Sequence, residues 1–283
     1  MIDIKQFGKG AVKNPIDIRD FRGEPIFGAE PLPIEYSIKD KIGRVENQDG
    51  SSSCVSQAFS SYSEVLNTIE TGEKKQLSPR DIYSLTFLPQ GGSYLRDAAK
   101  KICNSGVVPE DEAPSYDNGN PPSETFMRNR ADITEIADED GMKYLAKTFI
   151  TWDNTNFDTY KRAIYQGNGC VIACRGNDVC WANAKIQTPD VASQATWGHG
   201  IFCCGWKVID GIEYLEFLNS WGTEWGDGGY GYLPKSYIEK GLVFNPITLI
   251  DLPNNYYSNQ LKLISILKNL ILLYQQLIAK LKK

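Results

Sequence analysis

Residues 47–59 read Asn-Gln-Asp-Gly-Ser-Ser-Ser-Cys-Val-Ser-Gln-Ala-Phe and bring one cysteine to the point where a polar run ends and an apolar pattern begins. Beyond that cysteine, apolar residues recur at steps of three and four: Val55, Ala58, Phe59, Tyr62, Val65, Leu66 and Ile69. The spacing predicts a helix from Ser53 to about Glu70 with one buried face, closed by Gly72. Cys54 is therefore expected at the N-terminus of a helix.

This position favours reactivity at Cys54. The first N–H groups of a helix have no partner inside it, and the positive end of the helix dipole stabilises an anion. The thiolate is the reactive form of cysteine, so Cys54 is a candidate nucleophile. The competing interpretation is a small buried apolar residue near a helix start, and only the rest of the chain can decide between the two.

Length and charge restrict the class of protein. A chain of 283 residues with a formal net charge of −5 can bury a substantial core. We expect one domain of about 220 residues, in one or two lobes, with additions at both ends. The negative charge argues against nucleic acid as a partner.

Cysteine usage suggests a compartment. The seven cysteines are Cys54, Cys103, Cys170, Cys174, Cys180, Cys203 and Cys204, and with a single histidine they form no zinc pattern. We expect neither metal nor cofactor. Residues 1–21 contain no apolar signal segment, so a reducing, cytoplasmic compartment is the simpler expectation. A bridge from Cys180 to Cys170 or Cys174 stays open.

The order of elements predicts an α+β fold. Residues 1–31, rich in proline and glycine, read as an extended arm, followed by a domain over 32–250. Ser78-Pro79 signals a second helix, and residues 94–103 a third. The second half carries β-rich runs at 169–173, 200–206, 213–218 and 229–233, with one helix over 157–165. A helical N-terminal lobe then meets a β-rich, barrel-like C-terminal lobe at a cleft.

Residues 251–283 have a different pattern. Leucine and tyrosine step by four and three residues from Leu263 to Leu281, which predicts an amphipathic helix over about 261–281. Docking on its own domain and self-association into a homo-oligomer fit equally well, and binding to a membrane surface is a weaker option. A membrane span is not expected, because polar residues interrupt the apolar run.

A thiol nucleophile needs a base and a group that orients the base. The only histidine, His199, stands in Trp197-Gly198-His199-Gly200-Ile201, ahead of a predicted strand. Asn219 follows twenty positions later and begins Asn-Ser-Trp-Gly-Thr-Glu-Trp-Gly. Because Asn219 ends a strand that neighbours the one starting at His199, the two side chains can meet, and the amide oxygen can select the imidazole tautomer.

At this point the chain resembles the papain-like cysteine proteases. The Gln48 to Cys54 spacing, the helix after Cys54, the Gly91-Gly92 pair, His199 and the Asn219-Ser220-Trp221-Gly222 block stand in the order of that family. The resemblance extends from about Leu32 to Ile238 and implies the two-lobed papain-like fold. It also implies a thiol endopeptidase that acts on polypeptides.

The resemblance assigns roles residue by residue. Cys54 would attack the peptide carbonyl, His199 would form its ion pair and protonate the leaving amine, and Asn219 would orient His199. The Gln48 side chain and the Cys54 N–H would form the oxyanion hole. Substrate would contact Gly91, Gly92, Trp197 and Gly198, with Trp221 covering the His199–Asn219 bond.

The sequence departs from the family at the cleft. Val55 stands where a tryptophan usually follows the nucleophile, and Ser52 replaces a common glycine, so the cleft should differ in shape. Ser51 stands where secreted members commonly place a disulfide cysteine. The arm is shorter than the usual inhibitory propeptide, so either none is needed or the arm covers the cleft itself. Alternative functions are a transpeptidase or amide hydrolase with the same site, and an inactive papain-like binding or structural module.

Overall fold

The computed structural model describes residues 2–17, 20, 30–116, 122–152, 155–251 and Tyr274. Contacts between Cα atoms divide the chain into two units, Met1–Ile250 and Asp251–Lys283. The predicted C-terminal amphipathic helix lies outside the described residues, apart from Tyr274, which is helical and exposed. Within the part of the chain that is described, we find no helix with the length and apolar character needed to cross a membrane.

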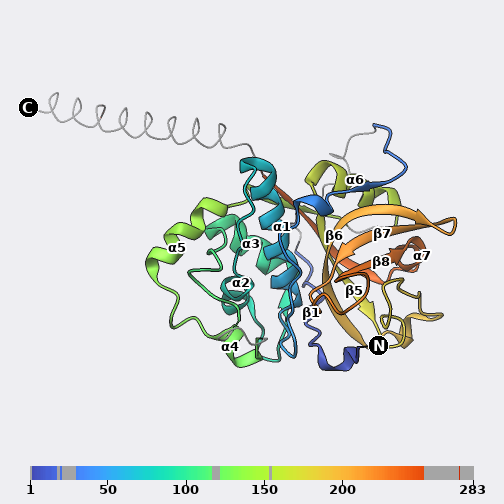
Figure 1. Ribbon diagram of the computed structural model, residues 1–283, viewed down its shortest axis with the longest axis horizontal. Coiled ribbons are helices and arrows are strands. Elements are labelled where there is room, and N and C mark those ends of the chain that lie inside the picture. The colour runs from blue at the N-terminus through green and yellow to red at the C-terminus, as the bar shows by residue number, and fades with distance from the viewer. Residues whose placement is uncertain are drawn as a thin grey trace, which may run out of the picture. The chain divides into compact units, whose positions relative to one another are not determined.

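The first unit has a helical side and a sheet side (Figure 1). Its α-helices are α1 (Cys54–Thr71), α2 (Pro79–Thr86), α3 (Leu95–Ser105), α4 (Glu124–Arg128), α5 (Glu135–Gly141), α6 (Phe157–Gly167) and α7 (Lys235–Glu239). Its strands are β1 (Ala11–Val12), β2 (Tyr36–Ser37), β3 (Ser93–Tyr94), β4 (Thr148–Thr151), β5 (Cys170–Gly176), β6 (Trp197–Ile209), β7 (Ile212–Leu218), β8 (Tyr230–Pro234) and β9 (Val243–Ile250). The predicted α+β class, with a helical lobe before a β-rich lobe, is confirmed.

The larger sheet is antiparallel. Its described strands run in the order β4-β9-β5-β6-β7-β8, and β2 pairs with β6 beside this path. The long strand β6 lies next to β5, with Cys174 opposite His199, and next to β7, with Phe202 opposite Leu218. Since Asn219 directly follows β7, this register brings it to the same end of the sheet as His199.

The two faces of the sheet cover two apolar cores. In β5, Val171 and Ala173 pack with α1 and α3, whereas Cys170 and Ile172 pack with α6 and the tryptophan-rich segments on the other face. Successive side chains of a strand point to opposite faces, so a strand buried on both faces is apolar throughout. This explains the continuous apolar runs at 170–174 and 201–204.

Helix α1 is more deeply buried than its amphipathic pattern predicts. Its residues are buried without interruption from Cys54 to Leu66, including several serines and Glu64. Two of these polar side chains are satisfied by the segment that leads to α2. Ser60 Oγ donates to the Leu77 carbonyl at 2.6 Å, and the Leu77 N–H donates to Glu64 Oε1 at 2.8 Å. The left-handed conformation of Gly72 (φ 79°) closes the helix as expected.

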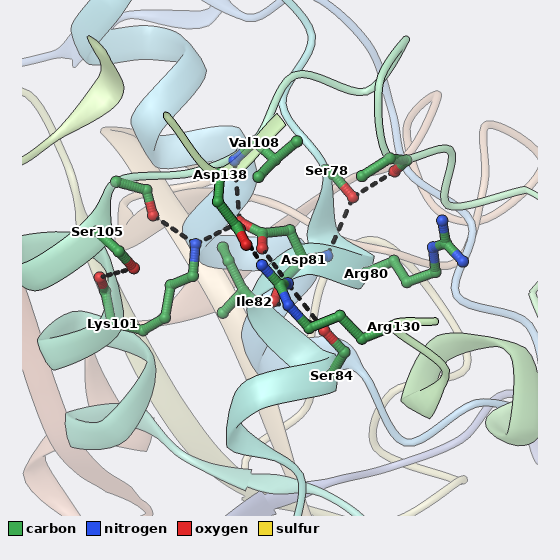
Figure 2. Close-up of polar contacts among 12 residues, drawn as sticks. Ser78, Arg80, Asp81, Ile82, Ser84, Lys101, Ser105, Val108, Arg130 and Asp138 are labelled. Atoms are coloured by element: carbon green, nitrogen blue, oxygen red, sulfur yellow. Dashed lines mark hydrogen bonds and ion pairs between the residues drawn. The ribbon is translucent and has the colours of Figure 1, made fainter. Parts of the chain in front are cut away.

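A buried ion-pair network fixes the helical lobe (Figure 2). Asp81 in α2 lies between Lys101 of α3, to which it is hydrogen bonded, and Arg130, whose Nη1 is 2.6 Å from Oδ1. The Val108 N–H also donates to Asp81 at 2.9 Å, and Arg130 reaches Asp138 in α5. A buried carboxylate with three donors is compensated for its desolvation, so Asp81 joins α2, α3 and α5 into one body.

The cysteines outside α1 do not form the bridges left open by the sequence. Cys170, Cys174 and Cys180 are buried thiols in the core behind the sheet. Cys170 lies directly opposite Cys203 in the β5–β6 register. These thiols behave as small apolar residues of the core.

Candidate active site

Cys54 is the first residue of α1 and is fully buried. The side chain of Ser53, the N-cap residue, does not cap the helix, because its hydroxyl contacts Ser51 Oγ at 2.7 Å instead. The Gly200 N–H donates to Cys54 Sγ at 3.4 Å, so the sulfur lies against the residue that follows His199. A Cβ added to Gly200 would come within 3.2 Å of the Val55 Cα, which shows how closely β6 approaches the start of α1.

His199 is oriented by Asn219, as the sequence predicts. Its Nε2 lies 2.8 Å from Asn219 Oδ1, and the ring is completely buried. The other ring nitrogen, Nδ1, has no hydrogen-bond partner among the described residues. The Trp221 ring covers the imidazole at 4.6 Å between ring centroids. An imidazole with one nitrogen engaged by an amide oxygen keeps the other for proton transfer.

Ser220 links Gln48 to the same constellation. Its hydroxyl donates to Gln48 Oε1 at 2.5 Å, and its N–H donates to Asn219 Oδ1 at 2.9 Å. The Gln48 amide nitrogen is left pointing at carbonyl oxygens, those of Ser51 and Gly8, each at 2.8 Å. Gln48 is thus fixed as a donor to an oxygen at the cleft, the geometry that an oxyanion hole requires.

Residues 7–12 of the N-terminal arm occupy this site. The Gly8 carbonyl oxygen accepts a hydrogen bond from the Gln48 side-chain amide, and the Gly10 N–H donates to Cys54 Sγ at 3.3 Å. The Phe7 ring stacks on Trp221 with centroids 5.4 Å apart and planes 6° apart. Strand β1 then pairs in parallel with β3, so the described part of the arm covers the thiol.

Glycines make the close approach of the arm possible. A Cβ on Gly10 would stand 2.0 Å from the Ser52 carbonyl oxygen, and one on Gly92 would stand 2.1 Å from the Gly10 carbonyl oxygen. A Cβ on Gly198 would likewise meet the Ala11 carbonyl oxygen at 2.2 Å. Gly92 and Gly198 therefore face the occupant of the cleft, and Gly91 lies beside Ser52.

Lys9 of the arm places its ammonium group next to the histidine. Nζ lies 5.8 Å from the Trp197 ring centroid, 5.5 Å from that of Trp221 and 3.9 Å from Asp178 Oδ1. It also donates to the Ile4 carbonyl of the arm at 2.5 Å. Burial lowers the pKa of Lys9, and Asp178 is the main group that opposes this.

With the arm in place, both Cys54 and His199 are neutral. Burial raises the pKa of Cys54 despite the N–H groups of Gly200 and Gly10 that point at its sulfur. Burial also lowers the pKa of His199 to about 3, opposed by Asn219 and assisted by the charge of Lys9. The helix N-terminus alone therefore does not produce a thiolate here, because desolvation outweighs it.

A cluster of buried carboxylates adjoins the loop that carries Gln48. Arg44 contacts Glu46 at 2.6 Å and Glu110 at 3.3 Å, and the Tyr116 hydroxyl lies 3.1 Å from Glu46. Burial, reinforced by neighbouring carboxylates, raises the pKa of Glu46 to about 7 and that of Glu64 to about 8. The single Arg44 guanidinium interacts with Glu46, Glu64 and Glu110, so it cannot neutralise all three carboxylates. Bound protons reduce the remaining negative charge.

The structure brings together all of the predicted site residues, but sequence reasoning missed several neighbours. The motif that contains Ser220 predicts no separate role for it, and no sequence pattern marks Phe7, Lys9 or Asp178. The spacing of Gly8 and Gly10 was the one available signal, since alternating glycines let a backbone lie close to another surface.

The fold and the motif agree with comparisons to known proteins. A family model described as "Papain family cysteine protease" matches residues 32–243. A cysteine protease of Blomia tropicalis is 24% identical over 220 residues, covering 76% of this chain and 65% of that protein. The chain thus matches less than two thirds of that relative's length.

Solved structures show the same fold. Xylellain, a cysteine protease from Xylella fastidiosa, superposes with a TM-score of 0.73 at 21% identity, covering 87% of this chain and 97% of that chain. The ragweed pollen allergen cysteine protease Amb a 11, solved in its proform, gives 0.63 at 19% identity, covering 80% of this chain and 68% of that one.

The expected cytoplasmic, reducing compartment is wrong. Relatives in this family are typically secreted or lysosomal and carry a pro-segment, and the ragweed protein is seen in its proform. The cysteine argument failed for a physical reason: thiols buried in a core stay unpaired through packing, whatever the redox state outside.

The matched region contains Cys54, His199 and Asn219 together with the lobes that hold them, and it exceeds half of the chain. The resemblance predicted from the sequence is confirmed. The chain belongs to the papain family of cysteine proteases.

Proposed function

We propose that the protein is a cysteine endopeptidase that hydrolyses peptide bonds through a thioester acyl-enzyme. The observation that carries this is the His199–Asn219 contact of 2.8 Å, which engages Nε2 and leaves Nδ1 for the thiol. In the first step Nδ1 accepts the Cys54 proton as Sγ bonds to the carbonyl carbon. The Gln48 amide and the Cys54 N–H then bind the oxyanion.

Collapse of the tetrahedral intermediate breaks the C–N bond. His199 gives its proton to the leaving amine, and water, deprotonated by the same imidazole, releases the acid and the thiol. A transpeptidase or amide hydrolase would share every step up to the acyl-enzyme, and differ only in the molecule that accepts the acyl group. An inactive binding module would need no unpartnered His199 Nδ1.

We also propose that residues 7–12 hold the enzyme closed. Three contacts support this. The Gln48 amide donates to the Gly8 carbonyl, the Gly10 N–H donates to the Cys54 sulfur, and the Phe7 ring stacks on Trp221. No substrate carbonyl can reach Gln48 while the Gly8 oxygen is bound there. The resting protein should then be activated by displacement of the arm.

Labelling with an epoxysuccinyl thiol probe tests both proposals in the full-length chain. The Gly10→Ala variant, whose Cβ would meet the Ser52 carbonyl at 2.0 Å, should displace the arm and be labelled at least about tenfold faster than wild type. Intact mass and peptide mapping should place one adduct on Cys54. A His199→Ala change in that background should abolish labelling.

The Cys103→Ser variant is the matched control, because Cys103 is the least buried of the thiols and should not change the result. Failure of Cys54 to react in the Gly10→Ala protein would contradict the peptidase proposal. Equal labelling rates for wild type and Gly10→Ala would contradict the closed-arm proposal alone.

A further inference from the structure

The ammonium of Lys9 lies in a slot formed by Asp178, Trp197 and Trp221. This slot is on the leaving-group side of the proposed site. His199 protonates the leaving amine through Nδ1, so the residue that carries this amine must sit beside the imidazole. The imidazole is bordered there by Trp221 at 4.6 Å and Trp197 at 6.2 Å between ring centroids. The ammonium of Lys9 lies over these same two rings.

The slot is built for a cation by residues of the body. Asp178 Oδ1 accepts from Trp197 Nε1 at 2.9 Å, which fixes the carboxylate beside the indole that the cation covers. Trp197 is in turn held edge to face by the buried Trp181 at 5.5 Å. Two indole faces and a fixed carboxylate form a recognition site for an ammonium or guanidinium group.

The contacts of Lys9 separate into those that leave with the arm and those that stay. The Ile4 carbonyl and the charge of Asp3 belong to the arm. Asp178, Trp197 and Trp221 belong to the body and remain when the arm is displaced. An emptied slot would then present a carboxylate without a neighbouring cation and two indole faces to the substrate.

A cavity next to the slot is also lined by acidic residues, like the slot with its Asp178. Asp49 and Glu224 line this cavity of about 300 Å³, together with Trp221 and Phe7. No lysine or arginine lines this cavity among the described residues. The leaving-group side therefore favours positively charged segments of a polypeptide.

We propose that Asp178, Trp197 and Trp221 form a specificity subsite for a basic side chain on the residue whose amine is released. Lys9 occupies this subsite in the closed state. The proposal rests on the proposed peptidase function and adds a substrate class to it. Arginine should be accepted at least as well as lysine, because a guanidinium stays charged when buried and stacks on indole rings.

The test uses the full-length Gly10→Ala protein and peptides that differ only in the residue after the cleaved bond: arginine, lysine, norleucine or glutamate. Fragment masses confirm the cleavage position. We expect kcat/KM to favour arginine or lysine over norleucine by about tenfold. Asp178→Asn should reduce the ratio to about two, and Asp178→Lys should make glutamate the better residue.

Asp190→Asn is the matched control, since Asp190 is an exposed acid of the same loop region without a contact to Lys9, and it should leave the ratio unchanged. Cleavage of the norleucine peptide without a basic preference, or with a preference that Asp178→Lys does not invert, would overturn the subsite while leaving the peptidase intact. Absence of cleavage of every peptide and of Cys54 labelling would overturn both.

Discussion

Ser220 connects the two polar residues that flank the nucleophile. Its hydroxyl donates to Gln48 and its N–H donates to the Asn219 oxygen, so one residue sets the direction of the Gln48 amide and of the oxygen that contacts the imidazole. Ser220 touches neither thiol nor substrate in this arrangement, and its role is to position Gln48.

Removal of this hydroxyl should affect the rate more than binding. In Ser220→Ala the Gln48 amide loses the contact that fixes its oxygen, so we expect kcat to fall by about tenfold with KM within about twofold of the parent. Ser220→Thr, which retains the hydroxyl, should restore most of the rate. Steady-state kinetics in the Gly10→Ala background measures both, and a change in KM alone would contradict the positioning role.

Residue identity was predictable where a motif carries the chemistry. Cys54, His199 and Asn219 stand in local patterns, and each has a required role in thiol chemistry. Lys9 and Asp178 are 169 positions apart, and neither lies in a periodic or motif-bearing segment. Their meeting depends on where the arm crosses the body, which local sequence does not encode.

The start of α1 and strand β6 form a contact with almost no free space. Gly200 faces the backbone of Val55, and its N–H donates to the Cys54 sulfur. Val55, the residue that departs from the family pattern, thus presents its backbone and a small branched side chain to β6. The spacing between the proposed nucleophile Cys54 and the proposed base His199 is set by these two elements and not by side-chain flexibility.

A methyl group at position 200 should push strand β6 away from the start of α1. We expect Gly200→Ala to lower the free energy of unfolding by about 1–2 kcal/mol and kcat/KM by about 100-fold, because a shift of an ångström in the catalytic geometry is costly. Gly43→Ala is the matched control, with open space up to 3.7 Å around the added carbon. Thermal unfolding and kinetics would contradict this account if both variants behaved alike.

Elements with strong caps or periodicity were predictable, and short or edge elements were not. Ser78 caps α2, as expected, by accepting from the Asp81 N–H at 3.1 Å, and α3 ends at Gly106. Strands β4 and β9, which pair with each other, were missed. Their stability comes from a pairing between segments almost one hundred residues apart, which no window along the chain can detect.

At the scale of the whole molecule, the buried Glu46–Glu64 cluster makes stability depend on pH. Both groups have a higher pKa in the folded protein, about 7 and about 8, than the ordinary 4.5. The folded state therefore binds more protons than the unfolded state between about pH 4.5 and about pH 8. Their stabilising contribution is complete below pH 4.5 and is lost as pH rises through 7 to 8.

Glu64→Gln should remove part of this dependence. Between pH 6.5 and 8 we expect the titration of the two carboxyl groups to cost wild type about 2 kcal/mol of stability. His199 opposes this by about 0.4 kcal/mol, because its imidazole is neutral in the folded protein but still loses its proton over this range when unfolded, and it does so equally in every variant. The carboxyl contribution in the variant should be about a third of that in wild type, since only Glu46, whose pKa is the lower of the two, still titrates. Chemical unfolding at the two pH values measures the difference, with Glu73→Gln, an exposed acid, as the control. Parallel pH profiles for all three proteins would contradict the assignment.

The two-lobed architecture was predictable from the order of helical and β-rich segments. The occupation of the cleft by residues 7–12 was not. Composition predicts an extended arm over residues 1–31, but the destination of such a segment depends on the surface that it meets. Here the surface includes a donor amide, two indole faces and a row of glycines, which together select residues 7–12.

Because the occupant of the cleft is covalently part of the chain, it competes with substrate as a tethered ligand. Its effective concentration does not change on dilution and is on the order of millimolar for short flexible tethers. If the arm segment binds the cleft with an intrinsic Kd of about 1 μM, any competing peptide would then appear about a thousandfold weaker against the closed protein. Turnover would become sensitive to anything that lengthens or cuts the tether, even where the cutting point lies far from Cys54.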